Sequence, residues 1–181
     1  MDEADLLRRL RLKDEEAFNE LVQAYGPRLL RAARLITGNN QYAEELASDV
    51  FAEAYLALPR YRAESSLFNW LYAIMLNQFR YRLRQKKRFV PLTSEIVSID
   101  NQPEHPEKTD FVNNISNWLS LVSPEHRDVL ILKYLEQKKI DEIADILGIP
   151  VGTVKSRIHN ALESLRKIIK DMNLLPDSVT N

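Results

Sequence analysis

Residues Lys139–Ile169 read KIDEIADILGIPVGTVKSRIHNALESLRKII, and this stretch decides the fold of the C-terminal half of the chain. Apolar residues recur at helical spacing on both sides of a central turn, which predicts two helices. Gly148 suits a left-handed helix end, Pro150 and Gly152 predict a short non-helical link, and Thr153 is the expected cap of the second helix. The pattern is typical of a helix-turn-helix, whose second helix enters the DNA major groove. An ordinary helical hairpin with a solvated polar face is the alternative.

The second of these helices carries polar side chains away from its apolar stripe, close to its N-terminal end. In a helix-turn-helix this end meets the base edges, and lysine, serine and asparagine are suitable partners for bases or phosphates. The candidate contact residues are therefore Lys155, Ser156, His159 and Asn160.

The composition excludes several classes of protein. The 181 residues allow one domain or two small ones, and the net charge is −1. Without cysteine there is no disulfide framework and no thiolate metal site, which fits a reducing compartment. The first residues, Met-Asp-Glu-Ala-Asp, are acidic where a signal peptide is basic, and no apolar run approaches the roughly 20 residues of a membrane span. We therefore expect a cytoplasmic protein without membrane insertion.

The near-neutral net charge hides a local asymmetry. Arg80–Arg88, RYRLRQKKR, has six basic residues and no acid, whereas Glu95–Asp110 has five acids and one lysine. Charges are screened over about 8 Å at physiological salt, so a basic patch acts locally. The net charge therefore does not argue against nucleic-acid binding.

The N-terminal half predicts a series of helices. Residues 2–12 form a short first helix, and Asp14 caps a second one, which Gly26-Pro27 is expected to end. A third helix follows to Gly38, after which the asparagines at 39 and 40 form a turn and cap.

The next predicted helix, from about Gln41 to Leu58, is acidic on one side. Glu45, Asp49 and Glu53 share a face because they are spaced four residues apart. A solvated face is the ordinary interpretation of such a row, and a docking face for a basic partner is the functional one.

A long helix is predicted to begin near Leu67, with Ser65 or Ser66 as its cap, and to run into the basic patch. Aromatic side chains beside arginines suit single-stranded nucleic acid, because bases stack on rings while cations follow the backbone. For Trp70 alone a core position is favoured over a base contact. Further aromatics lie along the same helix at Phe68, Tyr72, Phe79 and Tyr81.

The domain organisation follows from where helical periodicity stops. Residues 90–110 lack it and contain three prolines among polar and acidic residues, which predicts a flexible acidic linker. We predict an all-α chain with one small domain over 1–89, a second containing the helix-turn-helix over 111–173, and a disordered tail over 174–181. Within the second domain, Ser123 and Pro124 mark the start of a helix.

No enzymatic chemistry is indicated. The three histidines, His105, His126 and His159, are scattered and have no metal-ligand spacing. The four glycines form no phosphate-binding loop, and no catalytic residues or cofactor site can be assigned.

Three stretches together resemble one family. Tyr61–Arg80, YRAESSLFNWLYAIMLNQFR, resembles the segment that melts the minus-10 promoter element in bacterial extracytoplasmic-function (ECF) sigma factors. Ser123–Leu162 is similar to their minus-35-reading domain, and Ala43–Leu58 resembles their polymerase-docking helix. The resemblance covers about residues 15–88 and 111–169, with its motifs in the order found in the family.

The resemblance implies a dissociable specificity subunit of bacterial RNA polymerase. Its implied partners are the polymerase core, through the β′ clamp helices and the β flap, promoter DNA, and an anti-sigma protein; no cofactor, metal or small-molecule substrate is implied. The implied polymerase-binding residues are Glu45, Asp49, Phe51 and Glu53. The implied minus-10 residues are Arg62, Ser65, Ser66, Asn69, Trp70, Tyr72, Asn77, Arg80, Arg84 and Arg88. The implied minus-35 residues are Thr153, Lys155, Ser156, Arg157, His159 and Asn160.

The chain departs from the family at a few of these positions. Ala63 stands where the family often has glycine, which predicts a different loop backbone there. Asn160 and Leu162 stand where many members have arginine, so the reading helix carries less positive charge. Asparagine can instead pair with adenine through two hydrogen bonds.

Two other functions compete with the sigma-factor hypothesis. A conventional helix-turn-helix regulator would bind duplex DNA tightly by itself, usually as a dimer. A protein-interaction module would keep the fold but not use its DNA surfaces. The aromatic and basic helix at 67–88 favours the sigma factor, because a plain regulator does not need it.

Overall fold

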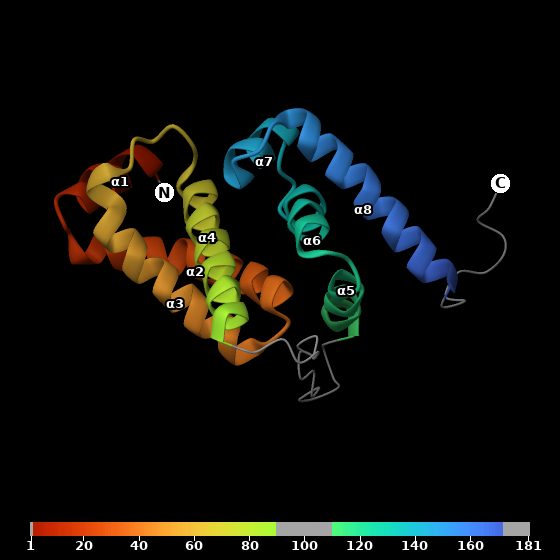
Figure 1. The fold of residues 1–181 in the computed structure, drawn as a ribbon. Coiled ribbons are helices and arrows are strands. Elements are labelled where there is room, and N and C mark those ends of the chain that lie inside the picture. The colour runs from red at the N-terminus through yellow and green to blue at the C-terminus, as the bar shows by residue number, and fades with distance from the viewer. Residues whose placement is uncertain (1, 90–109, 172–181) are drawn as a thin grey trace. The chain divides into compact units, whose positions relative to one another are not determined.

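The computed structural model describes residues 2–89 and 110–171, with side chains described over 2–85 and 115–170. The chain divides into two compact units, Met1–Asn101 and Gln102–Asn181, which we call unit 1 and unit 2 and describe separately. Every regular element in the described ranges is a helix (Figure 1), which confirms the all-α prediction. The predicted linker up to residue 109 and the predicted tail lie outside the described residues.

Unit 1 is a bundle in which α2 packs against α1, α3 and α4, and α3 packs against α4. Its core is apolar, with Leu21, Leu29, Leu46 and Leu71 fully buried. The predicted caps are confirmed where side chains meet free backbone N–H groups: Asn39 Oδ1, for example, accepts from Tyr42 N at 2.7 Å. The elements are α1 (Glu3–Arg11), α2 (Glu15–Thr37), α3 (Asn40–Ala57), the 3₁₀ turn η1 (Leu58–Arg60) and α4 (Leu67–Phe89).

The prediction that Gly26-Pro27 ends a helix is wrong, because α2 runs unbroken from Glu15 to Thr37. A proline inside a helix costs about 3 kcal/mol. Full burial of one leucine contributes about 1.5–3 kcal/mol, and α2 buries Leu21 before the proline and Leu29 after it. Burial on both sides of Pro27 therefore offsets its cost, which local sequence signals could not show.

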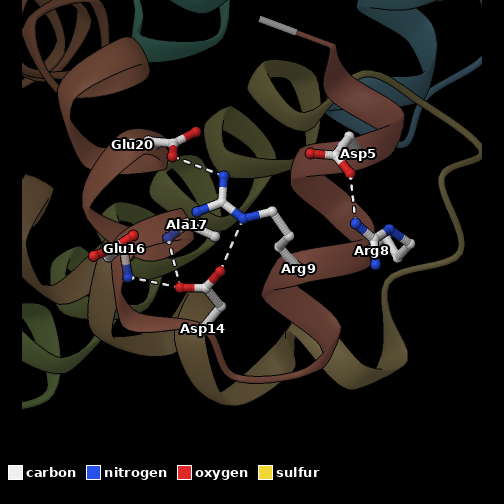
Figure 2. Close-up of polar contacts among 7 residues, drawn as sticks. All are labelled: Asp5, Arg8, Arg9, Asp14, Glu16, Ala17 and Glu20. Carbon is white, nitrogen blue, oxygen red and sulfur yellow. Dashed lines mark hydrogen bonds and ion pairs between the residues drawn. The ribbon is translucent and has the colours of Figure 1, made fainter.

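Arg9 fixes α1 to α2 (Figure 2). Its Nε donates to Asp14 Oδ2 at 2.8 Å and its Nη1 donates to Glu20 Oε1 at 2.7 Å. Asp14 Oδ1 also caps α2 by accepting from Glu16 N and Ala17 N at 2.9 and 3.2 Å. The Arg9 guanidinium and these backbone N–H groups hold the pKa of Asp14 below its usual range. Arg8 and Asp5 form an exposed ion pair at 2.8 Å, but both residues lie on α1, so this pair does not join the two helices.

Unit 2 contains α5 (Asp110–Ser120), α6 (Pro124–Leu130), a π-helical turn η2 (Ile131–Leu135), α7 (Ile140–Leu147) and α8 (Val151–Asp171). Ser123 Oγ caps α6 by accepting from His126 N at 3.3 Å, as predicted. Arg127 is buried and its Nε donates to Leu119 O at 2.8 Å, which joins α6 to the end of α5. Burial lowers the pKa of Arg127.

The helix-turn-helix is present as α7 and α8, which pack against each other. Gly148 ends α7 with φ 64°, the left-handed conformation predicted for it. The prediction for the start of α8 is wrong: the helix begins at Val151, so Gly152 and Thr153 lie inside its first turn. Pro150 opens the helix instead, since its carbonyl accepts from Val154 N at 3.1 Å. A helix start has N–H groups without helical partners, so glycine and threonine are tolerated there.

None of the described helices is both long and apolar enough to cross a membrane. The described residues also hold no cluster of three or more His, Cys, Asp or Glu side chains that could bind a metal ion.

Candidate nucleic-acid interface

The loop of residues 61–66 connects η1 to α4, and we call it the α4 loop. Tyr61 is buried at its start, and its ring lies 4.7 Å from the ring of Trp70. The Tyr61 hydroxyl donates to the Ser65 carbonyl oxygen, which closes the loop on itself. Burial raises the pKa of Tyr61 to about 12, so this hydroxyl keeps its proton at neutral pH. Residues 62–64 are exposed at the apex.

Ala63 at the apex has φ 59°, in the left-handed region. This conformation costs an alanine about 1–2 kcal/mol and costs glycine little. The resemblance described above placed Ala63 where the family often has glycine, which is the residue that adopts this conformation at little cost. The loop therefore has an alanine in a backbone conformation that glycine adopts more readily. The expected difference from the family's loop backbone stays a prediction.

The exposed side of α4 continues from this loop. Trp70, Asn77, Tyr81 and Arg84 share one face of α4 because they are separated by seven, four and three residues. Asn77, Tyr81 and Arg84 are exposed and Trp70 is half-buried. We call these four residues the α4 outer stripe. It presents aromatic rings, an amide and a cation in a row, which is the chemistry that binds single-stranded DNA. Tyr81 was named as an aromatic of this helix but was not among the implied minus-10 residues, although its spacing from Asn77 could have identified it.

Other candidates for minus-10 contact lie elsewhere. Tyr72 is 0% exposed and Asn69 is 5% exposed, so both side chains belong to the interior of unit 1. Ser66 caps α4, with its Oγ accepting from Asn69 N at 3.3 Å. Arg62 is exposed on the loop and Ser65 is half-buried there. Arg80 is half-buried on α4, and the side chain of Arg88 lies outside the described residues.

The row of acids predicted on α3 is present and exposed, and we call Glu45, Asp49 and Glu53 the α3 acidic face. Two of its carboxylates are paired with α4: Asp49 with Arg82, and Glu53 with the Gln78 side-chain amide. An exposed ion pair contributes only about 0–1 kcal/mol. A basic group of a partner can therefore replace Arg82 at little cost.

Phe51 was predicted beside these acids, but its side chain is only 8% exposed. It lies against Gly26 of α2, where α2 and α3 meet. The exposed apolar residue on the acidic side of α3 is instead Leu56, which is 79% exposed and three residues beyond Glu53. A surface of acids with one exposed leucine is suited to a protein partner.

The start of α8 carries the other predicted contacts. Lys155, Ser156, His159 and Asn160 are all exposed, and we call them the α8 polar face. Val154 and Ala161 on the opposite side are fully buried against the rest of unit 2. The helix-turn-helix therefore presents its polar face outward, as a recognition helix does.

Two predicted contacts on α8, Arg157 and Thr153, are half-buried and not fully exposed. Arg157 is half-buried, and its Nη2 lies 2.7 Å from Glu125 Oε2 of α6. Thr153 is half-buried, and its carbonyl accepts from Ser156 Oγ at 3.0 Å. Arg157 thus holds α8 to α6 in this structure, an arrangement that helical spacing could not reveal.

Comparison with known protein families gives two matches in the order of these surfaces. Residues 21–89 match Sigma-70 region 2, and residues 114–165 match Sigma-70, region 4. Together the matches cover about two thirds of the chain. The chain therefore belongs to the sigma-70 family of transcription initiation factors.

Relatives that match over nearly their whole length show which group of sigma-70 factors the chain resembles. The chain is 29% identical to the ECF RNA polymerase sigma factor SigW of Bacillus subtilis, over 92% of this chain and 96% of the relative. It is 29% identical to the ECF RNA polymerase sigma-E factor of Escherichia coli K12, over 88% of this chain and 90% of the relative. The protein is an ECF sigma factor, which directs transcription initiation at specific promoters.

Solved structures agree in fold. CnrH, in complex with the cytosolic domain of CnrY, matches with a TM-score of 0.71 at 23% identity, over 93% of this chain and 97% of CnrH. The sigma factor RpoE of Bartonella quintana, in complex with the anti-sigma factor NepR, matches with a TM-score of 0.70 at 24% identity, over 84% and 96% of the two chains.

Proposed function

We propose that the chain is a dissociable subunit of bacterial RNA polymerase in the cytoplasm that opens promoters through the α4 loop and the α4 outer stripe. The observation that carries this proposal is the continuity of the two: a closed loop with an exposed apex leads directly into an exposed row of Trp70, Asn77, Tyr81 and Arg84. The loop receives an unpaired minus-10 base, and the row stacks and neutralises the strand that follows.

The buried candidates take a different role in this proposal. Tyr72 and Asn69 support the start of α4 from the interior, and Ser66 caps it. Base contact falls to Arg62, Ser65 and the α4 outer stripe, because these groups reach solvent. Arg80 and Arg88 add to the positive charge near the strand.

Unit 2 supplies the second DNA contact in this proposal. The α8 polar face reads the minus-35 element, while Arg157 holds α8 in place through Glu125. Two weak DNA modules joined on one polymerase gain effective concentration, so neither needs to bind tightly alone. We assign residues 1–89 and 111–173 to the two modules.

The partners follow from the remaining surfaces. The α3 acidic face and Leu56 dock on the β′ clamp helices, and unit 2 meets the β flap. The structural relatives CnrH and RpoE are each bound by another protein, NepR being an anti-sigma factor. An anti-sigma protein that covers the same surfaces would regulate this chain. A conventional duplex-binding regulator is not favoured, because such a protein has no need of region 2.

The test removes two exposed groups of the α4 outer stripe together, Asn77→Ala with Arg84→Ala. On duplex promoter DNA with core polymerase, we expect permanganate-reactive minus-10 thymines to fall about thirtyfold, since each of the two lost contacts contributes about 1 kcal/mol. On a template melted in advance, transcription should stay near the wild-type level. Lys167→Ala, which removes an exposed cation outside the proposed surfaces, is the matched control. Undiminished opening of duplex DNA by the double variant would refute the assignment.

A further inference from the structure

We propose that α1 is a positioning element for the α4 loop, acting through Glu3 and Arg11. Glu3 Oε1 accepts from Leu67 N at 2.7 Å, and Arg11 Nη2 donates to the Tyr61 carbonyl oxygen at 3.1 Å. These two bonds hold Tyr61, the first residue of the loop, and Leu67, the residue that directly follows it. The inference rests on the proposed role of this loop in base capture and names the residues that keep it in shape.

The Glu3 contact completes the start of α4. The first turn of a helix has backbone N–H groups without helical partners and carries partial positive charge. Ser66 serves the N–H of Asn69, and the Glu3 carboxylate serves that of Leu67. The cap of α4 is thus shared between the loop itself and a helix more than sixty residues away in sequence.

The loop has a reason to need external support. Its apex residue Ala63 is held in the left-handed region, at φ 59°. Such a conformation persists where surrounding contacts determine it. The internal contacts are the Tyr61–Ser65 hydrogen bond and the tilted ring contact between Tyr61 and Trp70. Arg11 acts on the same Tyr61, so α1 restrains the residue on which these internal contacts depend.

The helix that supplies these contacts is itself fixed. Leu6, Leu7 and Leu10 are buried, and Arg9 ties α1 to Asp14 and Glu20 of α2 (Figure 2). Glu3 and Arg11 therefore belong to a helix that is itself held in place. The Sigma-70 region 2 match begins at residue 21, so α1 is outside the residues that this family model covers. The positioning contacts are a property of this chain that the family match does not describe.

The expected consequence is a loss of base discrimination without a loss of docking. A loop fixed before binding loses less conformational freedom when it captures a base. Removing one hydrogen bond should reduce discrimination between the preferred and a substituted minus-10 base about fivefold. Binding to core polymerase through α3 should not change, because neither Glu3 nor Arg11 belongs to that surface.

The experiment compares Glu3→Ala and Arg11→Ala with Glu3→Gln in the full chain. Glutamine keeps a carbonyl oxygen that can accept from Leu67 N, so Glu3→Gln should recover most of the discrimination. Asp5→Ala is the matched control, because it removes a carboxylate from the exposed side of α1. The readouts are the open-complex yield with core polymerase on two promoters that differ at one minus-10 base, and the affinity for core.

Hydrogen exchange of the α4 loop in the free chain provides a readout that does not depend on polymerase. Faster exchange at residues 62–67 in Glu3→Ala and Arg11→Ala, with Asp5→Ala unchanged, supports the inference. Wild-type exchange and wild-type discrimination in both variants overturn it. Absence of promoter opening by the wild-type chain overturns the proposed function, and the inference fails with it. If Glu3→Ala does not fold, Arg11→Ala and Glu3→Gln still provide the comparison.

Discussion

Replacing Ala63 with glycine should stabilise unit 1, although glycine usually destabilises proteins. The left-handed backbone at φ 59° costs alanine about 1–2 kcal/mol. Glycine removes that cost but gives up about 0.5–1 kcal/mol through the greater freedom of the unfolded chain. The net expectation is a gain of about 0.5–1 kcal/mol in the free energy of unfolding. With a urea dependence of about 1–2 kcal/mol per molar, the midpoint should rise by a few tenths of a molar.

The assay can be made specific for unit 1. The chain has two tryptophans, Trp70 beside the α4 loop and Trp118 in unit 2. In a Trp118→Phe background, fluorescence during urea unfolding reports on Trp70 alone. The matched control is Ala52→Gly, the same substitution at an exposed position inside α3, which should lower the stability by about 1 kcal/mol. If both glycines lower the midpoint, the left-handed conformation at residue 63 does not exist in solution.

Three further predictions use other parts of the chain. In Asp14→Asn, the free energy of unfolding should fall less steeply as the pH is lowered. The pKa of Asp14 is lowered in the folded state, so the stability that its carboxylate contributes is present above about pH 4 and is lost below it. Urea midpoints between pH 5 and pH 3 check this, and an unchanged slope would contradict it. Gly148→Ala should cost unit 2 about 1 kcal/mol, because φ is 64° there and nothing else crowds the site; unaltered thermal unfolding would argue against that backbone. Asp49→Arg should weaken binding to core polymerase about tenfold or more through like-charge repulsion, measured by fluorescence anisotropy; wild-type affinity would remove the docking assignment.

Local signals in the sequence predicted much of the fold. Capping by Asp14, Asn39 and Ser123 and the left-handed end at Gly148 depend on a few neighbouring residues, so sequence alone could place them. The continuity of α2 through Pro27 depends on burial against other helices, and no local signal indicates it.

The candidate sites were predicted less completely, for the same reason. Helical spacing placed the α3 acidic face and the α8 polar face outward, but it could not show that Phe51 and Tyr72 are buried. Arg157 is paired with Glu125 of another helix, and Glu3 accepts a hydrogen bond from Leu67, which is 64 residues later in the sequence. Contacts of this kind depend on tertiary packing.

The most direct measurement is run-off transcription with bacterial core polymerase, with and without the chain, combined with permanganate footprinting of the promoter. The template is a set of promoter fragments from the genomic neighbourhood of its own gene. We predict initiation that requires the chain, with thymines exposed at the minus-10 element. Tight binding of the isolated chain to duplex DNA, with no initiation and no association with core, would contradict this function and indicate a conventional regulator.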